Sequence, residues 1–433
     1  MDVGKAKRRE NIMYRFISIL SIGLLAIGLA ACSNGSPLAS PPAPKPSSTE
    51  LSTHAQLNSP PLQTASDNPV ASPSNSAEPV RREATLLAIG DIMVHMPQLP
   101  AYYNSTKKSY DLKPWFAQVK PIFSQGDWVI GNLEMPIAGQ DLKITGYPRF
   151  NAPYELAEAL ADAGVQLVST ANNHSMDRAF PGVTRTLANV RKAGLVPIGT
   201  SSSAADSRRM VIEERNGIRM GFLAYTYGTN GIPVPKDKSF AVNLIDPAAI
   251  KRDIAELRRA QADVVTISLH FGVEYQRMPN AYQTKLVREL VKSGADIILG
   301  SHPHVVQPYE EIRVPASESV DGNPRRGIAI YSLGNFISNQ TGNWKDVGLI
   351  FGVHLVKTEN ADGTSSTEWD KITTEPTWVH IQWKKQKRYY TVIPLKTALA
   401  SRDLPMLSDK DYKKMKELLT GIHKHLIQLQ PQS

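Results

Sequence analysis

Five short motifs in this sequence carry the side chains that divalent metal ions prefer as ligands. Two of their carboxylates, an amide and several imidazoles would form a mixed oxygen and nitrogen set that suits Mn²⁺, Fe or Zn²⁺. Five of the ten histidines lie in these motifs. No thiolate is present in them, so they do not form a cysteine-rich structural zinc site. The motifs are Gly90–His95, Gly131–Glu134, Asn172–Asp177, His270–Gly272 and Gly300–His304.

The last motif explains why the spacing indicates a metal site. The apolar run Ile297–Leu299 predicts a buried strand, and His302 and His304 follow it with one proline between them. The fixed φ angle of proline stiffens this turn, so the two neutral imidazoles can converge on one ion. Taken singly, Asp91 is better explained as a helix cap and Asn172-Asn173 as a plain turn. Only the complete set favours a metal site.

The segments that must position these motifs alternate between strand and helix patterns. We expect strands over Thr85–Ile89, Asp127–Gly131, Gln166–Thr170, Val264–Leu269 and Asp296–Gly300, and a hairpin over Val211–Tyr225 that turns at Asn216-Gly217. We expect helices over Lys113–Gln125, Tyr154–Ala163, Gly182–Ala193, Pro247–Gln261 and Tyr282–Ser293. This alternation predicts an α/β fold with parallel strands and a site at their carboxyl ends.

The pattern changes after Pro308. Four strands without intervening helices are expected over Ile328–Leu333, Gly348–Val356, Thr377–Trp383 and Tyr390–Leu395, and we expect them to form a second, more antiparallel sheet packed on the first. Residues 401–433 contain an amphipathic helix that begins with a capping box of Ser408 and Asp411. Its apolar face, which runs from Tyr412 to Leu429 at helical spacing, is expected to dock on the core.

The first 31 residues have the plan of a secretory signal, with five basic residues before an apolar run from Phe16 to Leu29. The run ends at Leu29-Ala30-Ala31-Cys32, which resembles a bacterial lipoprotein lipobox and implies cleavage before Cys32 and lipidation of it. A plain signal peptide or an uncleaved anchor is the alternative. Residues 32–83 are rich in Pro, Ser and Ala and are expected to form a disordered tether. We therefore expect a membrane-anchored, extracytoplasmic bacterial protein.

The charge of the chain restricts its partners only mildly. The formal net charge is +9, and about +6 remains once the signal segment is removed. A modest positive charge fits an acidic polymer or an anionic cell surface. The basic stretch Trp383–Tyr390 is interpreted as a solvated hairpin, and nucleic-acid binding is not expected outside the cytoplasm.

In order, the motifs resemble those of the calcineurin-like metallophosphoesterases. More closely, Gly90–Met93, Asn132–Glu134, Asn172–His174, Gly300–His304 and Ser332–Phe336 resemble the CapA family, over roughly residues 85–336. Members of that family are associated with the synthesis, export or anchoring of poly-γ-glutamate capsule. The resemblance implies a metallophosphatase-like sandwich of two sheets flanked by helices over residues 84–400, and two bound divalent metal ions.

The resemblance also implies a role for each motif residue. Asp91 and His304 would hold the first metal, and Glu134 would stand at the bridging position. Asn173, His270 and His302 would hold the second metal, and His174 would act as the catalytic residue over the substrate. Two departures leave alternatives open. His95 follows Asp91 by four residues instead of two, so it is a ligand, a group that orients one, or neither, and Asn132 is a further candidate ligand.

Three more residues have two interpretations each. Arg149 is either a contact for an acidic substrate or a surface arginine, and Asn335 lines the cleft or belongs to a turn. Asp177 is interpreted as a cap for the next helix, with a metal ligand as the less favoured alternative. The function expected from the whole is a metal-dependent hydrolase or transferase in the handling of a poly-γ-glutamate-like polymer, with polyglutamate synthase subunits as candidate partners. The alternatives are a general secreted phosphoesterase and a non-catalytic, polymer-binding surface lipoprotein.

Overall fold

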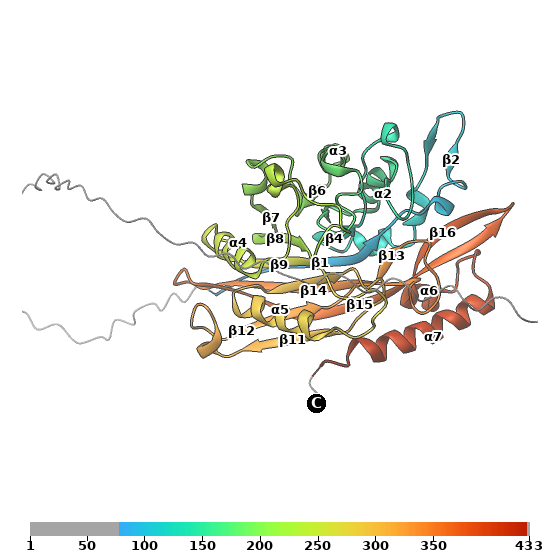
Figure 1. The fold of residues 1–433 in the computed structure, drawn as a ribbon. Coiled ribbons are helices and arrows are strands. Elements are labelled where there is room, and N and C mark those ends of the chain that lie inside the picture. The colour runs from blue at the N-terminus through green and yellow to red at the C-terminus, as the bar shows by residue number, and fades with distance from the viewer. Residues whose placement is uncertain (1–77, 431–433) are drawn as a thin grey trace, which may run out of the picture. The chain divides into compact units, whose positions relative to one another are not determined.

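A computed structural model describes residues 78–430 of this protein (Figure 1). The signal segment, Cys32 and most of the expected tether lie outside the described residues. The expected C-terminal boundary of the tether, residue 83, is too late, because strand β1 already begins at Val80. Among residues 78–430, no helix combines the length and the apolar character needed to cross a membrane.

The first sheet has the strand order β16-β15-β14-β1-β4-β5-β6, and β13 pairs with the end of β1. Strands β1, β4, β5 and β6 run parallel, whereas β14, β15 and β16 are antiparallel to their neighbours. The strands are β1 (Val80–Ile92), β4 (Trp128–Leu133), β5 (Leu167–Ser169), β6 (Val196–Ile198), β13 (Asn335–Ile337), β14 (Val347–Glu359), β15 (Ser365–Lys384) and β16 (Lys387–Pro394).

The second sheet has the strand order β11-β12-β10-β9-β8-β7. Its four inner strands are parallel and its two edge strands are antiparallel to them. The strands are β7 (Val211–Arg215), β8 (Ile218–Thr226), β9 (Val264–His270), β10 (Ile297–Ser301), β11 (Tyr309–Val314) and β12 (Arg325–Ile330), and a separate small pair is formed by β2 (Tyr103–Asn104) and β3 (Ser109–Tyr110). The expected hairpin is confirmed, with Asn216 and Gly217 at positive φ between β7 and β8.

Alternation along the strands places the two sheets face to face. In β1, Leu86 and Ala88 join the cluster between the sheets, whereas Leu87 and Ile89 join the cluster on the outer face. Because successive side chains of a strand point to opposite faces, an apolar run such as this one is buried on both sides. From the second sheet, Met220 and Phe222 of β8 complete the inner cluster.

Helices cover the two outer faces, which gives a helix–sheet–sheet–helix arrangement. Helix α2 packs on the first sheet through Leu156 and Leu160, and α4 and α5 pack on the second through residues such as Ile254 and Leu290. The helices are α1 (Lys120–Phe123), α2 (Glu155–Ala163), α3 (Ala179–Lys192), α4 (Pro247–Arg259), α5 (Ala281–Lys292), α6 (Leu395–Ser401) and α7 (Asp409–Leu426). The predicted α/β class, with two sheets flanked by helices, is confirmed.

The C-terminal helix docks as expected. Ser408 caps α7 and forms the predicted capping box with Asp411. Tyr412 and Met415 pack against the end of the first sheet, and Ile422 and Leu426 reach the cluster between the two sheets. Helix α7 is therefore an integral part of the compact unit (Figure 1).

Two expectations about the elements are wrong. The strands β14, β15 and β16 extend the first sheet beside β1 and do not form a sheet of their own, while β12 belongs to the second sheet. The expected helix over Lys113–Gln125 is a 3-10 turn at Lys113–Trp115 followed by the four-residue α1. Pro114 and Pro121 explain this break, because proline lacks the N–H group that a continuous helix requires.

Candidate metal centre

Two groups of three ligand side chains meet at the carboxyl ends of the strands. One consists of Asp91, Glu134 and His304, and the other of Glu134, His270 and His302. Within each group the ligand atoms lie within 4.8 Å of one another, and all of the residues are buried. Glu134, which the family resemblance places at the bridging position, belongs to both groups.

The close approach of neighbouring backbones brings these residues together. A Cβ atom on Gly90 would lie 1.9 Å from the carbonyl oxygen of Gly334, so only glycine fits where β1 meets this segment. The backbone N–H of Asp91 donates to that same carbonyl at 2.8 Å. The strand end that carries Asp91 is thereby fixed beside β13.

The loop after β10 holds its two histidines in an uncommon conformation. His302 has a φ of 99° and His304 a φ of 57°, in the region that side chains with a Cβ rarely adopt. Such strain persists only where the surrounding structure determines it, and it is concentrated at functional sites. Pro303 lies between the two residues, so the loop turns both imidazoles toward the same place.

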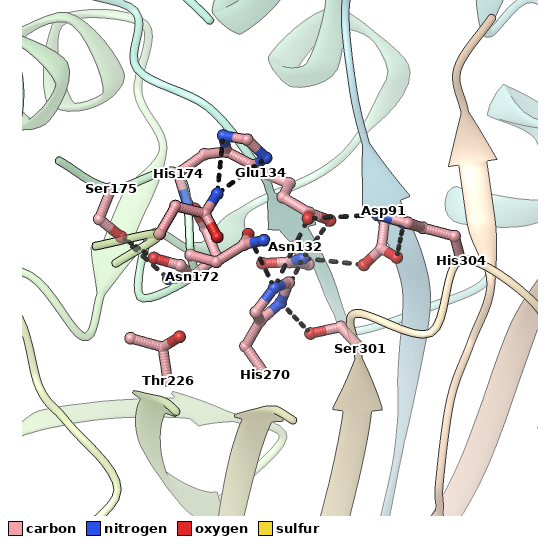
Figure 2. A network of polar contacts seen from close by, with 12 residues as sticks. Asp91, Asn132, Glu134, Asn172, His174, Ser175, Thr226, His270, Ser301 and His304 are labelled. Atoms are coloured by element: carbon pink, nitrogen blue, oxygen red, sulfur yellow. Dashed lines mark hydrogen bonds and ion pairs between the residues drawn. The ribbon is translucent and has the colours of Figure 1, made fainter. Parts of the chain in front are cut away.

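Hydrogen bonds orient the ligand side chains (Figure 2). His270 contacts the Ser301 hydroxyl through Nδ1 at 2.9 Å, and its Nε2 faces the Glu134 carboxylate at 3.5 Å. The Nδ1 atom of His304 lies 3.0 Å from Asp91 Oδ2, and the Oδ1 atom of Asn173 lies 3.1 Å from His270 Nε2. Holding the second ring nitrogen of a histidine in this way is typical of metal sites.

Burial and neighbouring charges shift the pKa values of the side chains in this centre. Burial, followed by the nearby Asp91 carboxylate, raises the pKa of Glu134 well above its usual range. Burial lowers the pKa of His302 to about 4 and that of His270 well below its usual value, and neighbouring histidines add to both effects. Two buried carboxylates beside neutral imidazoles form a set that a cation stabilises.

Unsatisfied polar atoms test whether the residues fit a metal. Among the described residues, Glu134 Oε1 and His302 Nδ1 are buried without a hydrogen-bond partner. Buried polar atoms are rarely left unpaired, and these two belong to the ligand groups themselves. The residues present therefore fit a divalent metal site with oxygen and nitrogen ligands.

Asn132 and His95, the two residues with open alternatives, have different surroundings in the structure. The amide nitrogen of Asn132 lies 2.8 Å from Asp91 Oδ1 and 3.3 Å from Glu134 Oε2, so this residue orients the carboxylates. Its Oδ1 atom is buried without a hydrogen-bond partner among the described residues, so Asn132 stays a candidate ligand. His95 belongs to neither ligand group. Its ring packs edge-on against Phe150, and its Nδ1 lies 3.3 Å from Gln98 Oε1. His95 forms part of the wall of the site.

The catalytic candidate His174 is held by a carboxylate whose role the sequence did not reveal. Asp177 was expected to cap the next helix, but its Oδ2 lies 2.8 Å from His174 Nδ1 and also accepts the backbone N–H of Phe150 at 2.7 Å. The Phe150 ring packs edge-on against the imidazole with centroids 4.7 Å apart. Asp177 is therefore the residue that positions His174.

The two residues suggested for substrate contact have different places. Arg149 is exposed, and its Nε donates to the carbonyl of Asp177 at 3.2 Å, which keeps it beside the His174 loop. Asn335 is fully buried, and its amide donates to Gln340 Oε1 at 3.1 Å and to the carbonyl of Lys345 at 2.8 Å. The amide nitrogen of Asn335 thus holds the local backbone, while its Oδ1 atom is buried without a hydrogen-bond partner among the described residues.

Aromatic residues that no motif revealed border the site. The ring of Tyr227 lies 4.7 Å from that of His302 and stacks parallel to His270, and Tyr275 lies 6.1 Å from His304. Both tyrosines are about half exposed, so they mark the side of the centre that faces solvent. Tyr227 directly follows strand β8. Other site residues also follow strands, so this position is a signal in the sequence that could have identified Tyr227.

Solved structures with a similar fold include a calcineurin-like phosphoesterase, YfkN from Bacillus subtilis, at 17% identity over 69% of this chain and 91% of that one, with a TM-score of 0.38. Another is the NAD nucleotidase NadN from Haemophilus influenzae, at 11% identity over 80% of this chain and 61% of that one, with a TM-score of 0.37. Similarities at this level do not assign a reaction.

Curated relatives share more of the sequence. The chain is 28% identical over 268 residues to the capsule biosynthesis protein CapA of Bacillus anthracis, covering 59% of this chain and 60% of that protein. It is 30% identical over 259 residues to the PGA biosynthesis protein CapA of Bacillus subtilis strain 168, covering 58% of this chain and 62% of that protein. The matched part spans about three fifths of each relative.

A family model described as bacterial capsule synthesis protein PGA_cap matches residues 85–340, which include every ligand of the two groups and the His174–Asp177 pair. The match extends over more than half of the chain. This protein belongs to the bacterial capsule synthesis protein family PGA_cap.

Proposed function

We propose that this protein acts in the synthesis, export or anchoring of a poly-γ-glutamate-like capsule polymer, and that its buried centre is a dinuclear metal site that hydrolyses bonds in that polymer. The observation that carries the proposal is the shared position of Glu134. Its Oε1 atom lies 3.5 Å from His270 Nε2 and 3.7 Å from His304 Nε2, so one carboxylate serves two groups of ligands. Family membership supports the choice of polymer.

In this proposal, Asp91, Glu134 and His304 hold one ion, and Glu134, His270 and His302 hold the other. Asn173 adds an amide oxygen beside His270. Bound divalent ions at such a site acidify a water molecule and polarise the bond under attack. Asn132 and Ser301 keep the carboxylates and the His270 ring in place by their hydrogen bonds.

His174 supplies a proton in this proposal. Its Nδ1 donates to Asp177 Oδ2, which fixes the ring and leaves Nε2 as the atom that exchanges a proton with the leaving group. The negative charge of Asp177 stabilises the positive charge that His174 carries when both ring nitrogens hold a proton. For an amide, the proton passes from Nε2 to the departing nitrogen; for an ester, it passes to the departing oxygen.

The proposed location follows from the sequence of the N-terminal segment. Cleavage before Cys32 and lipidation of it would leave about 50 residues between the anchor and β1, and this segment would hold the folded unit at the outer face of the membrane. Membrane-bound polyglutamate synthase subunits would then be partners within reach. These parts of the proposal rest on Leu29–Cys32 and on the composition of residues 32–79.

The test is a metal analysis and a bond-cleavage assay on the full chain, purified in detergent. We expect about two divalent ions per chain in the wild type, and new amino groups released from poly-γ-glutamate. The double variant His302→Ala, His304→Ala should lose both signals. The matched control, His354→Ala with His423→Ala, removes two histidines outside the site and should keep both.

The outcomes separate the possible functions. A wild type that takes up no added Mn²⁺ or Zn²⁺ would contradict the hydrolase proposal and favour a protein that only binds polymer. Metal-dependent cleavage of phosphoesters without cleavage of poly-γ-glutamate would replace the polymer by a phosphoester as the substrate.

A further inference from the structure

The hairpin that joins β15 to β16 carries four cations at and beside its turn. Lys384, Lys385, Lys387 and Arg388 lie within five consecutive residues, and Figure 1 shows that this hairpin projects from the sheet. Among the described residues, no carboxylate forms a salt bridge with any of the four, which differs from many other arginines and lysines of this chain, such as Lys357 and Arg325. We call residues 383–390 the cationic hairpin.

Aromatic residues hold two of these cations in place. The Arg388 guanidinium lies 4.7 Å from the centre of the Trp383 ring, and the Lys384 ammonium lies 5.8 Å from the centre of the Tyr389 ring. Trp383 is 61% exposed, which is unusual for so large an apolar side chain. The cationic hairpin therefore combines ordered positive charge with an exposed aromatic surface, a combination typical of binding surfaces.

The turn of the hairpin places a lysine in a backbone conformation that lysine rarely adopts. Lys385 and Gln386 both have positive φ angles, 48° and 61°. Two-residue turns of this kind are normally made by Asn-Gly, because both positions require φ above zero. Here a lysine occupies the first position in spite of the conformational cost.

The base of the hairpin touches the wall of the metal centre. Asn339 Oδ1 accepts hydrogen bonds from Arg388 Nη1 at 2.8 Å and from the Tyr390 hydroxyl at 2.5 Å. The backbone N–H of Asn339 points at His95 Nδ1, 3.4 Å away. His95 packs on Phe150, which packs on His174. The cationic hairpin and the catalytic candidate are thus joined by direct contacts.

A cavity of about 510 Å³ lies on the other face of the hairpin. Its walls are formed by side chains of the two hairpin strands and of three other segments: Tyr102, Pro114, His380, Gln382, Lys384, Tyr389, Thr391, Pro405 and Met406. These side chains offer a cation, hydrogen-bonding groups and aromatic faces along neighbouring strands. Among the described residues, Lys384 is the one cation of this lining, so the choice of occupant rests on the hairpin and not on the cavity.

We propose that the cationic hairpin binds a linear polymer with repeated carboxylates beside the metal centre. The inference rests on the proposed function, because it assigns the surface that recognises the substrate of that site. Charge complementarity carries the choice of occupant: four neighbouring cations that no carboxylate of the described residues neutralises attract a polyanion far more strongly than a neutral chain. Such binding weakens as salt is added.

The experiment measures the affinity of the full chain, in neutral detergent, for poly-γ-glutamate and for a neutral polysaccharide, at low and high salt. The hairpin variant is Lys384→Gln, Lys385→Gln, Lys387→Gln. The matched control is Lys413→Gln, Lys416→Gln, Lys424→Gln, which removes three exposed charges from helix α7. We expect the hairpin variant to bind poly-γ-glutamate on the order of tenfold more weakly at low salt, and the control to match the wild type.

Equal binding by the hairpin variant and the wild type would overturn the inference and leave the proposed function in place. A wild type that does not bind poly-γ-glutamate would instead overturn the proposed function. Hairpin-dependent binding to vesicles with anionic lipids, without binding to the polymer, would show that the hairpin contacts a membrane and would also overturn the inference. If the triple variant fails to fold, Lys385→Gln with Lys387→Gln at the exposed turn repeats the measurement.

Discussion

Glu134 Oε1 lies 3.5 Å from the Nε2 atom of His270 and 3.7 Å from that of His304, two histidines that belong to different ligand groups. No hydrogen bond from the described residues satisfies this oxygen, although it is fully buried. A single atom in this position can be shared between two ions. The metal content of substituted proteins therefore tests the arrangement directly.

Replacing the shared carboxylate should weaken both ions together. Glu134→Gln keeps the size of the side chain but removes its charge, and we expect the affinity for both metals to fall by at least about tenfold. Asp91→Asn should affect chiefly one ion, because Asp91 belongs to one group only. Calorimetric titration with Mn²⁺ or Zn²⁺ measures the metal affinities of the two variants.

The matched control for this pair is Glu274→Gln, which removes an exposed carboxylate near the site. It should leave the number of bound ions unchanged. Wild-type metal affinity in Glu134→Gln would show that this carboxylate is not a shared ligand.

Asp177→Asn should reduce turnover without a comparable change in substrate affinity. Asp177 contacts His174 and not the ligand groups, so its loss leaves His174 less well oriented and its positive charge less stabilised. We expect kcat to fall by roughly 10- to 100-fold, within the range that a general acid contributes, and KM to change little. Steady-state kinetics on a cleaved polymer or ester measures the two separately.

A double-mutant cycle supplies the control for this prediction. In a His174→Ala background, Asp177→Asn should have no further effect on kcat. An equal loss in both backgrounds would mean that Asp177 acts independently of His174.

The metal-free protein should lose stability as the pH falls below about 6.5. Burial lowers the pKa of His302 to about 4, and burial also lowers the pKa of His95 to about 4 against the opposing effect of Gln98. Both groups stay neutral in the folded state but take up a proton on unfolding between these two pH values. The free energy of unfolding therefore decreases with falling pH, by at most about 1.4 kcal/mol per pH unit for each group.

Urea unfolding of chelator-treated protein between pH 7.5 and 4.5 measures this slope. His95→Gln should make the slope shallower, and His423→Gln, on the exposed face of α7, should not change it. A slope that stays the same in His95→Gln would show that this buried ring does not contribute to the pH dependence.

Gly300→Ala should destabilise the protein strongly. A Cβ atom at this position would lie 1.9 Å from the carbonyl oxygen of Tyr331, so β10 and the segment after β12 would have to separate. We expect the free energy of unfolding to fall by at least about 3 kcal/mol. Denaturant unfolding measures the loss, and Gly228→Ala, where no heavy atom lies within 4 Å of the added Cβ, should change stability by less than about 0.5 kcal/mol. Similar values for the two variants would contradict the packing argument.

Much of the site could be predicted because strand ends in an α/β fold converge on one edge. Asp91, Glu134 and His270 each stand at the end of an apolar run of the sequence, and the structure brings them together. The role of Asp177 could not be predicted in this way. It depends on the loop that carries Phe150, far away in the sequence, and on the local turn that points Asp177 back at His174.

The error in the sheet arrangement has a different cause. The pattern of β14 indicates a strand but does not say which strand it pairs with. Its partner proves to be β1, more than 250 residues earlier, with Val80 opposite Glu359 at one end of the ladder. Likewise, edge strand β11 was missed because the charged residues Glu310, Glu311 and Arg313 interrupt its apolar pattern.

The pairing of β1 with β14 has a consequence for folding during translation. During synthesis, β1 emerges early, and β4 can cover one of its edges soon afterwards. The other edge must wait until residues 347–359 have been made, which lie beyond the segment matched by the family. A chain released after residue 340 would expose ten unpaired positions along its central strand, and such an edge is a template for aggregation. We therefore expect the nascent chain to stay prone to self-association through the free edge of β1 until about four fifths of it has been translated and β14 can pair with that edge.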